Sequence, residues 1–150
     1  MYKSLLSLLV IASFSTLFAS NAAVGDWLTP EKDSIIRVYK CGSKFCGKIQ
    51  CLKQPNDKSG KPKTDTENEK ASLRSRAILG LKFMKGFKWD DGEYVDGTIY
   101  NSRNGKTYCG KMYLEGGKLN LKGRICYTFL GKTNVWTKTN AASSGMTCAK

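Results

Sequence analysis

The sequence contains no histidine. This absence excludes the Ser-His-Asp and Cys-His catalytic groups and all acid–base chemistry that depends on an imidazole. Carboxylates remain as candidates for glycoside hydrolysis, and the densest group of them follows Trp89: Asp90, Asp91, Glu93 and Asp96. A polar turn between two strands explains the same group more simply. We therefore predict that the protein is not an enzyme and requires no cofactor.

The sequence also lacks a Cys-x-x-Cys motif, so that a zinc site is not expected and we predict no bound metal. Six cysteines are present, and an even number favours disulfide bonds in an exported protein. Cys41 and Cys46 flank a tight turn, which predicts that they pair. Cys51 and Cys148 are then a further pair that would tie the C-terminal tail to the third strand.

No hydrophobic run is long enough to cross a bilayer comfortably, because the longest one covers only residues 5–18. A basic start at Lys3 precedes this run, and the small residues 19–23 follow it. This order predicts a signal peptide over residues 1–22 and one domain over residues 23–150. An uncleaved N-terminal anchor is the alternative. The absence of an Asn-x-Ser/Thr sequon favours a bacterial protein that is periplasmic or secreted.

Acidic residues are scarce relative to basic ones, and the whole chain carries a net charge of +13. Lys3 is the only charged residue of the predicted signal peptide, so cleavage would leave +12. A charge of this size favours anionic partners such as nucleic acid, anionic lipid or an acidic ligand. The lysines are scattered rather than clustered, and a lysine-rich soluble surface is an equally valid interpretation.

After residue 23 the hydrophobic pattern has a period of two, interrupted at short intervals by turn residues. A Thr66-x-x-Glu69 spacing predicts one short helix that runs to about residue 76. The connections are short and hairpin-like, which favours an all-β, eight-stranded antiparallel up-and-down barrel with at most that one helix. The predicted strands are residues 24–29, 34–40, 45–52, 77–85, 96–101, 106–114, 118–127 and 133–139.

The hairpin near residue 117 predicts the third disulfide. With Gly117 and Lys118 as the turn, Cys109 lies directly opposite Cys126, in the closer type of antiparallel pair. With Gly116 and Gly117 as the turn, the register shifts by two residues and the same pair becomes diagonal. The first register is the one that we expect.

Gly25-x-Trp27 resembles the Gly-x-Trp signature of lipocalins, in which the tryptophan closes the barrel floor beneath an arginine. Here Lys138, after Trp136, takes the place of that arginine, and either Lys138 or Arg124 is expected to cover Trp27. The whole chain resembles the bacterial family called domain of unknown function 2147. The motifs that carry this resemblance are Gly25-x-Trp27, Cys41-Gly42, Phe45-Cys46-Gly47-x-Ile49, Gly60-x-Pro62-x-x-Asp65-x-x-Asn68, Leu73-Arg74-x-Arg76-x-x-x-Gly80-Leu81, Gly97-x-Ile99-Tyr100, Gly105-Lys106-x-Tyr108, Leu119-x-Leu121-x-Gly123 and Trp136-Thr137-Lys138. The departures are Glu69, Ala77 and Lys138.

The resemblance implies a periplasmic lipocalin-like barrel that carries an apolar ligand such as a fatty acid. We expect Arg74 and Arg76 to hold the acidic head of such a ligand, because a guanidinium binds a carboxylate through two parallel bonds. The segment 53–70 would act as a lid. The expected apolar lining is Leu79, Leu81, Phe83, Tyr100, Tyr108 and Met112.

Two alternatives remain at this point. Asp65 could pair with a neighbouring arginine while Asn68 caps a turn, so that the group only pins the loop. The barrel could also be filled by its own side chains and serve to bind a protein or a polyanion, although export makes nucleic acid a poor partner. The structural residues predicted on either hypothesis are Gly25, Trp27, Asp65, Asn68, Trp136 and Lys138.

Overall fold

The computed structural model describes residues 20–150. Most of the predicted signal peptide, residues 1–19, therefore lies outside the described residues. Within the described part of the chain we find no helix with the length and hydrophobicity that a membrane crossing requires.

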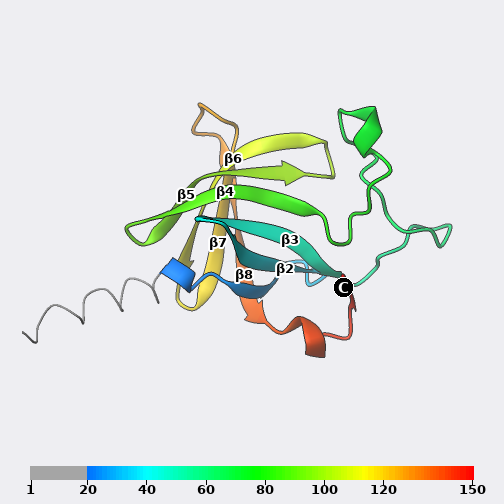
Figure 1. Cartoon of the computed structure of the whole chain (residues 1–150), viewed down its shortest axis with the longest axis horizontal. Helices are drawn as coiled ribbons and strands as arrows, with labels where there is room; N and C mark the ends of the chain where they lie inside the picture. The colour runs from blue at the N-terminus through cyan, green and yellow to red at the C-terminus, as the bar shows by residue number, and fades with distance from the viewer. Residues whose placement is uncertain (1–19) are drawn as a thin grey trace, which may run out of the picture.

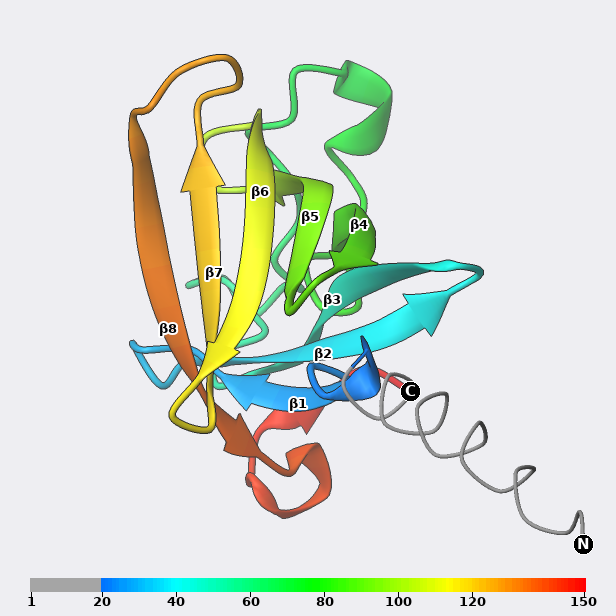
Figure 2. The same ribbon diagram turned by 90° about the vertical axis from the view of Figure 1, so that its left-hand side faces the viewer.

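Eight antiparallel strands close into an up-and-down barrel (Figures 1 and 2). Each strand pairs with the next along the chain, and β1 pairs with both β2 and β8, which closes the sheet. A short ninth strand adds to the outer side of β3. The all-β, eight-stranded barrel expected from the hydrophobic pattern is thus confirmed. The strands are β1 Gly25–Leu28, β2 Ser34–Cys41, β3 Lys44–Leu52, β4 Lys82–Asp90, β5 Glu93–Asn101, β6 Lys106–Glu115, β7 Lys118–Arg124, β8 Gly131–Thr139 and β9 Thr147–Cys148.

The segment between β3 and β4 differs from the prediction. The predicted helix from Thr66 shrinks to one 3-10 turn, Ala71–Leu73, and the Thr66 hydroxyl caps no helix. The predicted strand over residues 77–85 begins only at Lys82, because the backbone of residues 77 and 78 pairs with the loop at residues 63 and 64. Local patterns were overridden here by contacts within the long loop.

The hairpin between β6 and β7 turns at Gly116 and Gly117, which have φ angles of 55° and 72°. Two successive residues in the left-handed region define a type I′ turn, the form that suits the twist of a hairpin. The expected register with Gly117 and Lys118 in the turn is therefore wrong, and the alternative register is correct. Cys109 lies opposite Arg124 and reaches Cys126 diagonally, with a Cα–Cα distance of 5.1 Å.

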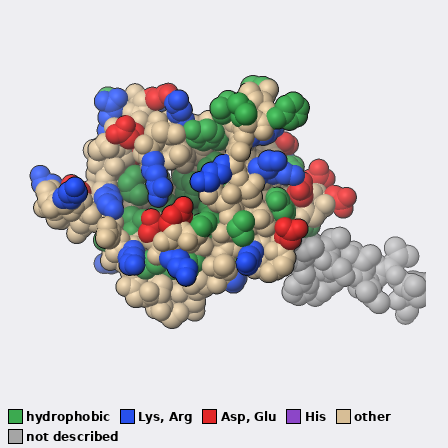
Figure 3. All heavy atoms as spheres, turned by 180° about the vertical axis from the view of Figure 1, so that it is seen from behind, with side chains coloured by type: hydrophobic (Ala, Val, Ile, Leu, Met, Phe, Trp, Pro, Cys, Tyr) green, Lys and Arg blue, Asp and Glu red, His purple; other side chains and the backbone are tan. Residues whose placement is uncertain are grey.

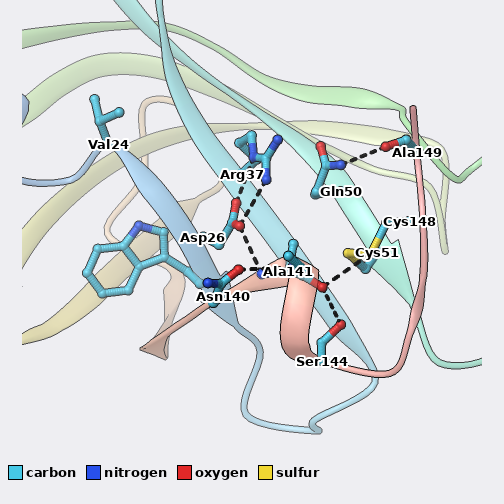
Figure 4. Close-up of polar contacts among 12 residues, drawn as sticks. Val24, Asp26, Arg37, Gln50, Cys51, Asn140, Ala141, Ser144, Cys148 and Ala149 are labelled. Carbon is cyan, nitrogen blue, oxygen red and sulfur yellow. Dashed lines mark hydrogen bonds and ion pairs between the residues drawn. A yellow bond between two sulfur atoms is a disulfide. The ribbon is translucent and has the colours of Figure 1, made fainter.

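All three disulfides join the cysteines that the sequence predicted, Cys41–Cys46, Cys51–Cys148 and Cys109–Cys126. The Cys51–Cys148 bond fixes the C-terminal tail beside β3, and Gln50 donates a hydrogen bond to the Ala149 carbonyl at 2.8 Å (Figure 4). The tail therefore covers the edge of β3 rather than leaving it as an open strand edge.

A second contact holds the start of this tail to the barrel (Figure 4). Asp26 on β1 accepts two hydrogen bonds from Arg37 on β2, at 2.7 and 2.9 Å, and a third from the Ala141 backbone N–H at 3.0 Å. The bond from Arg37 is the main cause that lowers the pKa of Asp26, since burial acts in the opposite direction. Asp26 thus connects three segments that are distant in the sequence.

Large side chains fill one end of the barrel. Trp27 is 2% exposed, its indole donates a hydrogen bond to the Ala23 carbonyl, and the Lys138 ammonium lies 4.5 Å from its ring centroid. Gly25 has a φ of 133°, and a Cβ atom there would collide with the Lys138 side chain. Arg124 lies near the opposite end, where it bonds to Thr128, so Lys138 alone covers Trp27. The other side chains that fill this end are Val38, Phe45, Phe87, Tyr94, Met112 and Leu119, while Trp136 also belongs to the core.

Replacing Trp27 with alanine should lower the free energy of unfolding by about 3–5 kcal/mol, because a large buried side chain leaves a cavity that the barrel cannot collapse to fill. Denaturant unfolding followed by circular dichroism measures this loss. Phe129→Ala is the matched control, because that ring is fully exposed and its removal should have little effect on stability. Equal midpoints for the parent and Trp27→Ala would contradict the role of Trp27 as the barrel floor.

Candidate ligand cavity

The other end of the barrel is hollow. A cavity of about 540 Å³ opens there, between the β1–β2, β5–β6 and β7–β8 connections. Its wall is mostly apolar and comes from seven strands, β2 to β8. The apolar wall residues are Ile36, Ile49, Phe83, Ile99, Leu121 and Trp136. The barrel therefore combines a filled floor with an open, hydrophobic upper half.

Three glycines form a row across the barrel wall, and of these Gly123 lines the cavity. Gly97, Gly110 and Gly123 lie side by side across β5, β6 and β7. A Cβ atom at Gly97 would collide with the Phe87 ring, and one at Gly110 would collide with Ile99. At Gly123 the nearest side chain is 3.5 Å from such an atom, so no large group covers the third glycine. Glycine within a strand often marks such a close approach, and here the first two glycines make room for Phe87 and Ile99.

Polar and charged side chains surround the cavity mouth. The cations are Arg103, Arg124 and Lys132, and the lining also includes Glu31 and Asp33. Arg103 lies 3.7 Å from the Asp33 carboxylate, and Arg124 donates a hydrogen bond to the Thr128 carbonyl. Lys132 is exposed and forms no hydrogen bond or ion pair with any described residue, which leaves its charge available at the rim.

Of the predicted lining residues, Phe83, Tyr100 and Tyr108 line the cavity. Met112 is fully buried in the filled floor, because it packs at the other end of β6. Leu79 and Leu81 precede β4 and are absent from the lining, since the chain enters the barrel only at Lys82.

Arg74 and Arg76 also lie outside the cavity lining. Arg76 forms a salt bridge of 2.7 Å with Asp65 and stacks over the Tyr100 ring, while Arg74 donates a hydrogen bond to the Asn68 carbonyl. The sequence could not reveal this because the buried Asp65 satisfies Arg76 within the loop itself. The alternative in which these residues pin the loop describes the observed contacts.

Asp65 is the centre of this loop. It is fully buried, and it accepts hydrogen bonds from Tyr100 at 2.7 Å, Asn68 at 2.8 Å and Arg76 at 2.8 Å. Burial alone would raise the pKa of Asp65, but the three donors and the charge of Arg76 outweigh it, so that the pKa is lowered. Burial and the hydrogen bond to Asp65 raise the pKa of Tyr100. The network fixes Tyr100 in the cavity wall.

The predicted lid, residues 53–70, contributes nothing to the lining. Figure 1 shows this green segment beside the barrel, before β4, and it is held there through Asp65 and Asn68. Of the acidic group after Trp89, Asp90 ends β4, Asp91 lies in the β4–β5 turn, and Glu93 and Asp96 lie on β5. Glu93 pairs with Lys111 at 2.8 Å. Among residues 20–150 no group of three or more potential ligands could hold a metal ion.

The model of one protein family matches residues 25–138, and its description is "Uncharacterized protein conserved in bacteria (DUF2147)". Among solved structures, the barrel is similar to protein HP1028 from Helicobacter pylori, which is described as belonging to the lipocalin family. The two share 22% sequence identity with a TM-score of 0.70, over 85% of this chain and 92% of that one. At this identity the likeness shows a lipocalin-like fold. No curated protein matches the sequence.

The Asp65 network predicts a pH-dependent contribution to stability. Because the folded-state pKa of Asp65 is lowered, its contribution is present above the ordinary aspartate value of 3.8 and is lost as the pH falls below it. Asp65→Asn should cost about 3 kcal/mol at neutral pH, since it leaves Arg76 without its partner. In the variant, the free energy of unfolding should also decrease less as the pH is lowered, which unfolding titrations at several pH values measure. Asp91→Asn, in an exposed turn, should change neither quantity. An unchanged acid profile for Asp65→Asn would refute this assignment.

Proposed function

The chain belongs to the DUF2147 family of bacterial proteins, and we propose that it is an exported carrier that holds an elongated apolar molecule with an acidic head. The observation that carries this proposal is the hollow upper half of the barrel. Lipocalin-like barrels of eight strands have room for one small ligand. Three disulfides support a site of action in the periplasm or outside the cell, where such bonds persist.

The size and composition of the cavity support an apolar ligand. Its volume of about 540 Å³ lies in the range of typical small-molecule sites. Ile49, Ile99 and Leu121 offer the ligand an aliphatic wall, and Trp136 adds an aromatic surface. Burial of an alkyl chain there would contribute about 0.8 kcal/mol for each methylene group.

The rim supports an acidic head. The Lys132 side chain is unpaired within the described residues. Arg124 on β7 pairs with Gly131, the residue that precedes Lys132 on β8, so the two cations lie near each other at the rim. A carboxylate bound here remains partly hydrated, so its charge does not have to be buried without compensation. This proposal moves the head-group contact from Arg74 and Arg76 to the rim residues of β7 and β8.

A binding role fits the residues better than catalysis. The chain has no histidine, and the cavity lining contains no cysteine and two carboxylates, both at the rim. A filled barrel that serves only as an interaction module has less support, because the side chains leave the upper half of the interior open.

Filling the cavity should abolish ligand binding. Gly123→Leu adds a large side chain to the wall without backbone strain, since the position is not in the left-handed region. We expect displacement of a fluorescent fatty acid to weaken at least tenfold, which corresponds to about 1.4 kcal/mol. Thr133→Leu adds the same side chain to the outer surface of β8, between two residues that line the cavity, and should bind like the parent.

Circular dichroism and thermal unfolding establish that both variants remain folded. No saturable binding by the parent, at any ligand chain length tested, would refute the carrier proposal. Equal binding by Gly123→Leu and the parent would show that the ligand binds outside this cavity.

Removing the rim charge should weaken binding of acids selectively. Lys132→Gln should reduce affinity for a fatty acid roughly fivefold, as expected for an exposed ion pair. Its affinity for the matching fatty alcohol should stay unchanged. Lys122→Gln removes an equal charge from an exposed site on β7 that does not line the cavity, and serves as the control. An equal loss for acid and alcohol would contradict recognition of the head by Lys132.

A further inference from the structure

The β7–β8 connection, residues 125–130, exposes more apolar surface than any other described segment. Phe129 and Tyr127 are fully exposed, at 104% and 102%, and Leu130 and Ile125 are 70% and 52% exposed. Figures 1 and 2 show this orange loop projecting beyond the neighbouring strands, and Figure 3 shows hydrophobic side chains at the same upper edge. Contiguous apolar surface on a protein marks a site of interaction with a protein or a membrane.

The loop is held in this shape by several bonds. The Cys109–Cys126 disulfide ties it to β6. The Ile125 N–H donates to the Leu130 carbonyl at 2.9 Å, and the Thr128 hydroxyl donates to the Ile125 carbonyl at 2.8 Å. These bonds present Tyr127 and Phe129 outward in the free protein. Docking through such a loop loses little conformational entropy, because the loop is already ordered.

The two charged residues that adjoin the loop in the sequence are both cations. Arg124 and Lys132 stand at the two ends of the loop, where β7 ends and β8 begins. The acidic residues of the cavity rim, Glu31 and Asp33, come from the β1–β2 connection instead. The apolar tip is therefore flanked by cations.

We propose that this loop docks the protein on an anionic phospholipid membrane, with Tyr127 and Phe129 inserted among the headgroups. Aromatic side chains together with lysine and arginine are the combination that binds such an interface. A stable protein partner would require a broad face of about 800 Å², whereas this loop is a narrow projection of six residues.

The docked orientation has a consequence for the cavity. Ile125 and Leu130 belong both to the loop and to the cavity lining. Insertion of the tip would therefore place the cavity mouth against the lipid surface, where an apolar ligand could pass without crossing water. The docking site goes beyond the carrier function and does not depend on which ligand the barrel holds.

Vesicle sedimentation with the purified protein tests this proposal. We expect binding to vesicles that contain phosphatidylglycerol, little binding to pure phosphatidylcholine, and weaker binding as salt rises. The double variant Tyr127→Ser with Phe129→Ser should bind phosphatidylglycerol vesicles at least tenfold more weakly, because two apolar side chains no longer insert. The second double variant, Lys82→Gln with Lys85→Gln, removes two positive charges from exposed positions of β4 and keeps the loop intact, and it should bind more strongly than the loop variant.

Three outcomes would overturn the docking proposal. They are failure of the parent to bind phosphatidylglycerol vesicles at low salt, equal binding by the loop variant, and a loop variant that changes only the oligomeric state in analytical ultracentrifugation. The last outcome would identify a second copy of the chain as the occupant. Fatty-acid displacement in solution, measured on the same variants, should be unchanged, so failure of docking and failure of the carrier function are distinguishable.

Discussion

The pairing of β1 with both β2 and β8 is the constraint on which the rest of the structure depends. A sheet closed in this way encloses a fixed interior, and every inward side chain must share it. Trp27 extends from β1 into that interior and, with Lys138 above it, completes the floor. Because the large aromatic and aliphatic groups gather at this end, the remaining volume lies at the other end, and the cavity follows from closure.

Much of the architecture was accessible from the sequence because each strand carries its own alternating pattern and each turn its own glycine. The Cys41–Cys46 disulfide followed from its spacing around a tight turn, Cys109–Cys126 from the hairpin, and Cys51–Cys148 from the two cysteines that remained. The hairpin register could not be deduced from the sequence, because Gly116-Gly117 and Gly117-Lys118 both make acceptable two-residue turns. The helix predicted in the long β3–β4 segment does not form, because Asp65 and Asn68 bond to each other and to Tyr100 of β5. Only one 3-10 turn is left of it.

The candidate site was less predictable than the fold. Its wall combines residues from seven strands, so no local motif marks it. Arg74 and Arg76 were attractive as cations beside the longest loop, yet their charge does not reveal that the buried Asp65 already binds Arg76 and the Asn68 carbonyl binds Arg74. Tyr100 was placed correctly in the lining, and the structure adds that the Asp65 network positions it.

In the glycine row across β5, β6 and β7, the third position, Gly123, lines the cavity. Gly123 pairs with Gly110 through backbone groups, which do not depend on the side chain at position 123, whereas the space in this part of the cavity does depend on that side chain. Under the proposed carrier function, a larger side chain at position 123 would leave room only for a smaller ligand, while the barrel itself would stay the same.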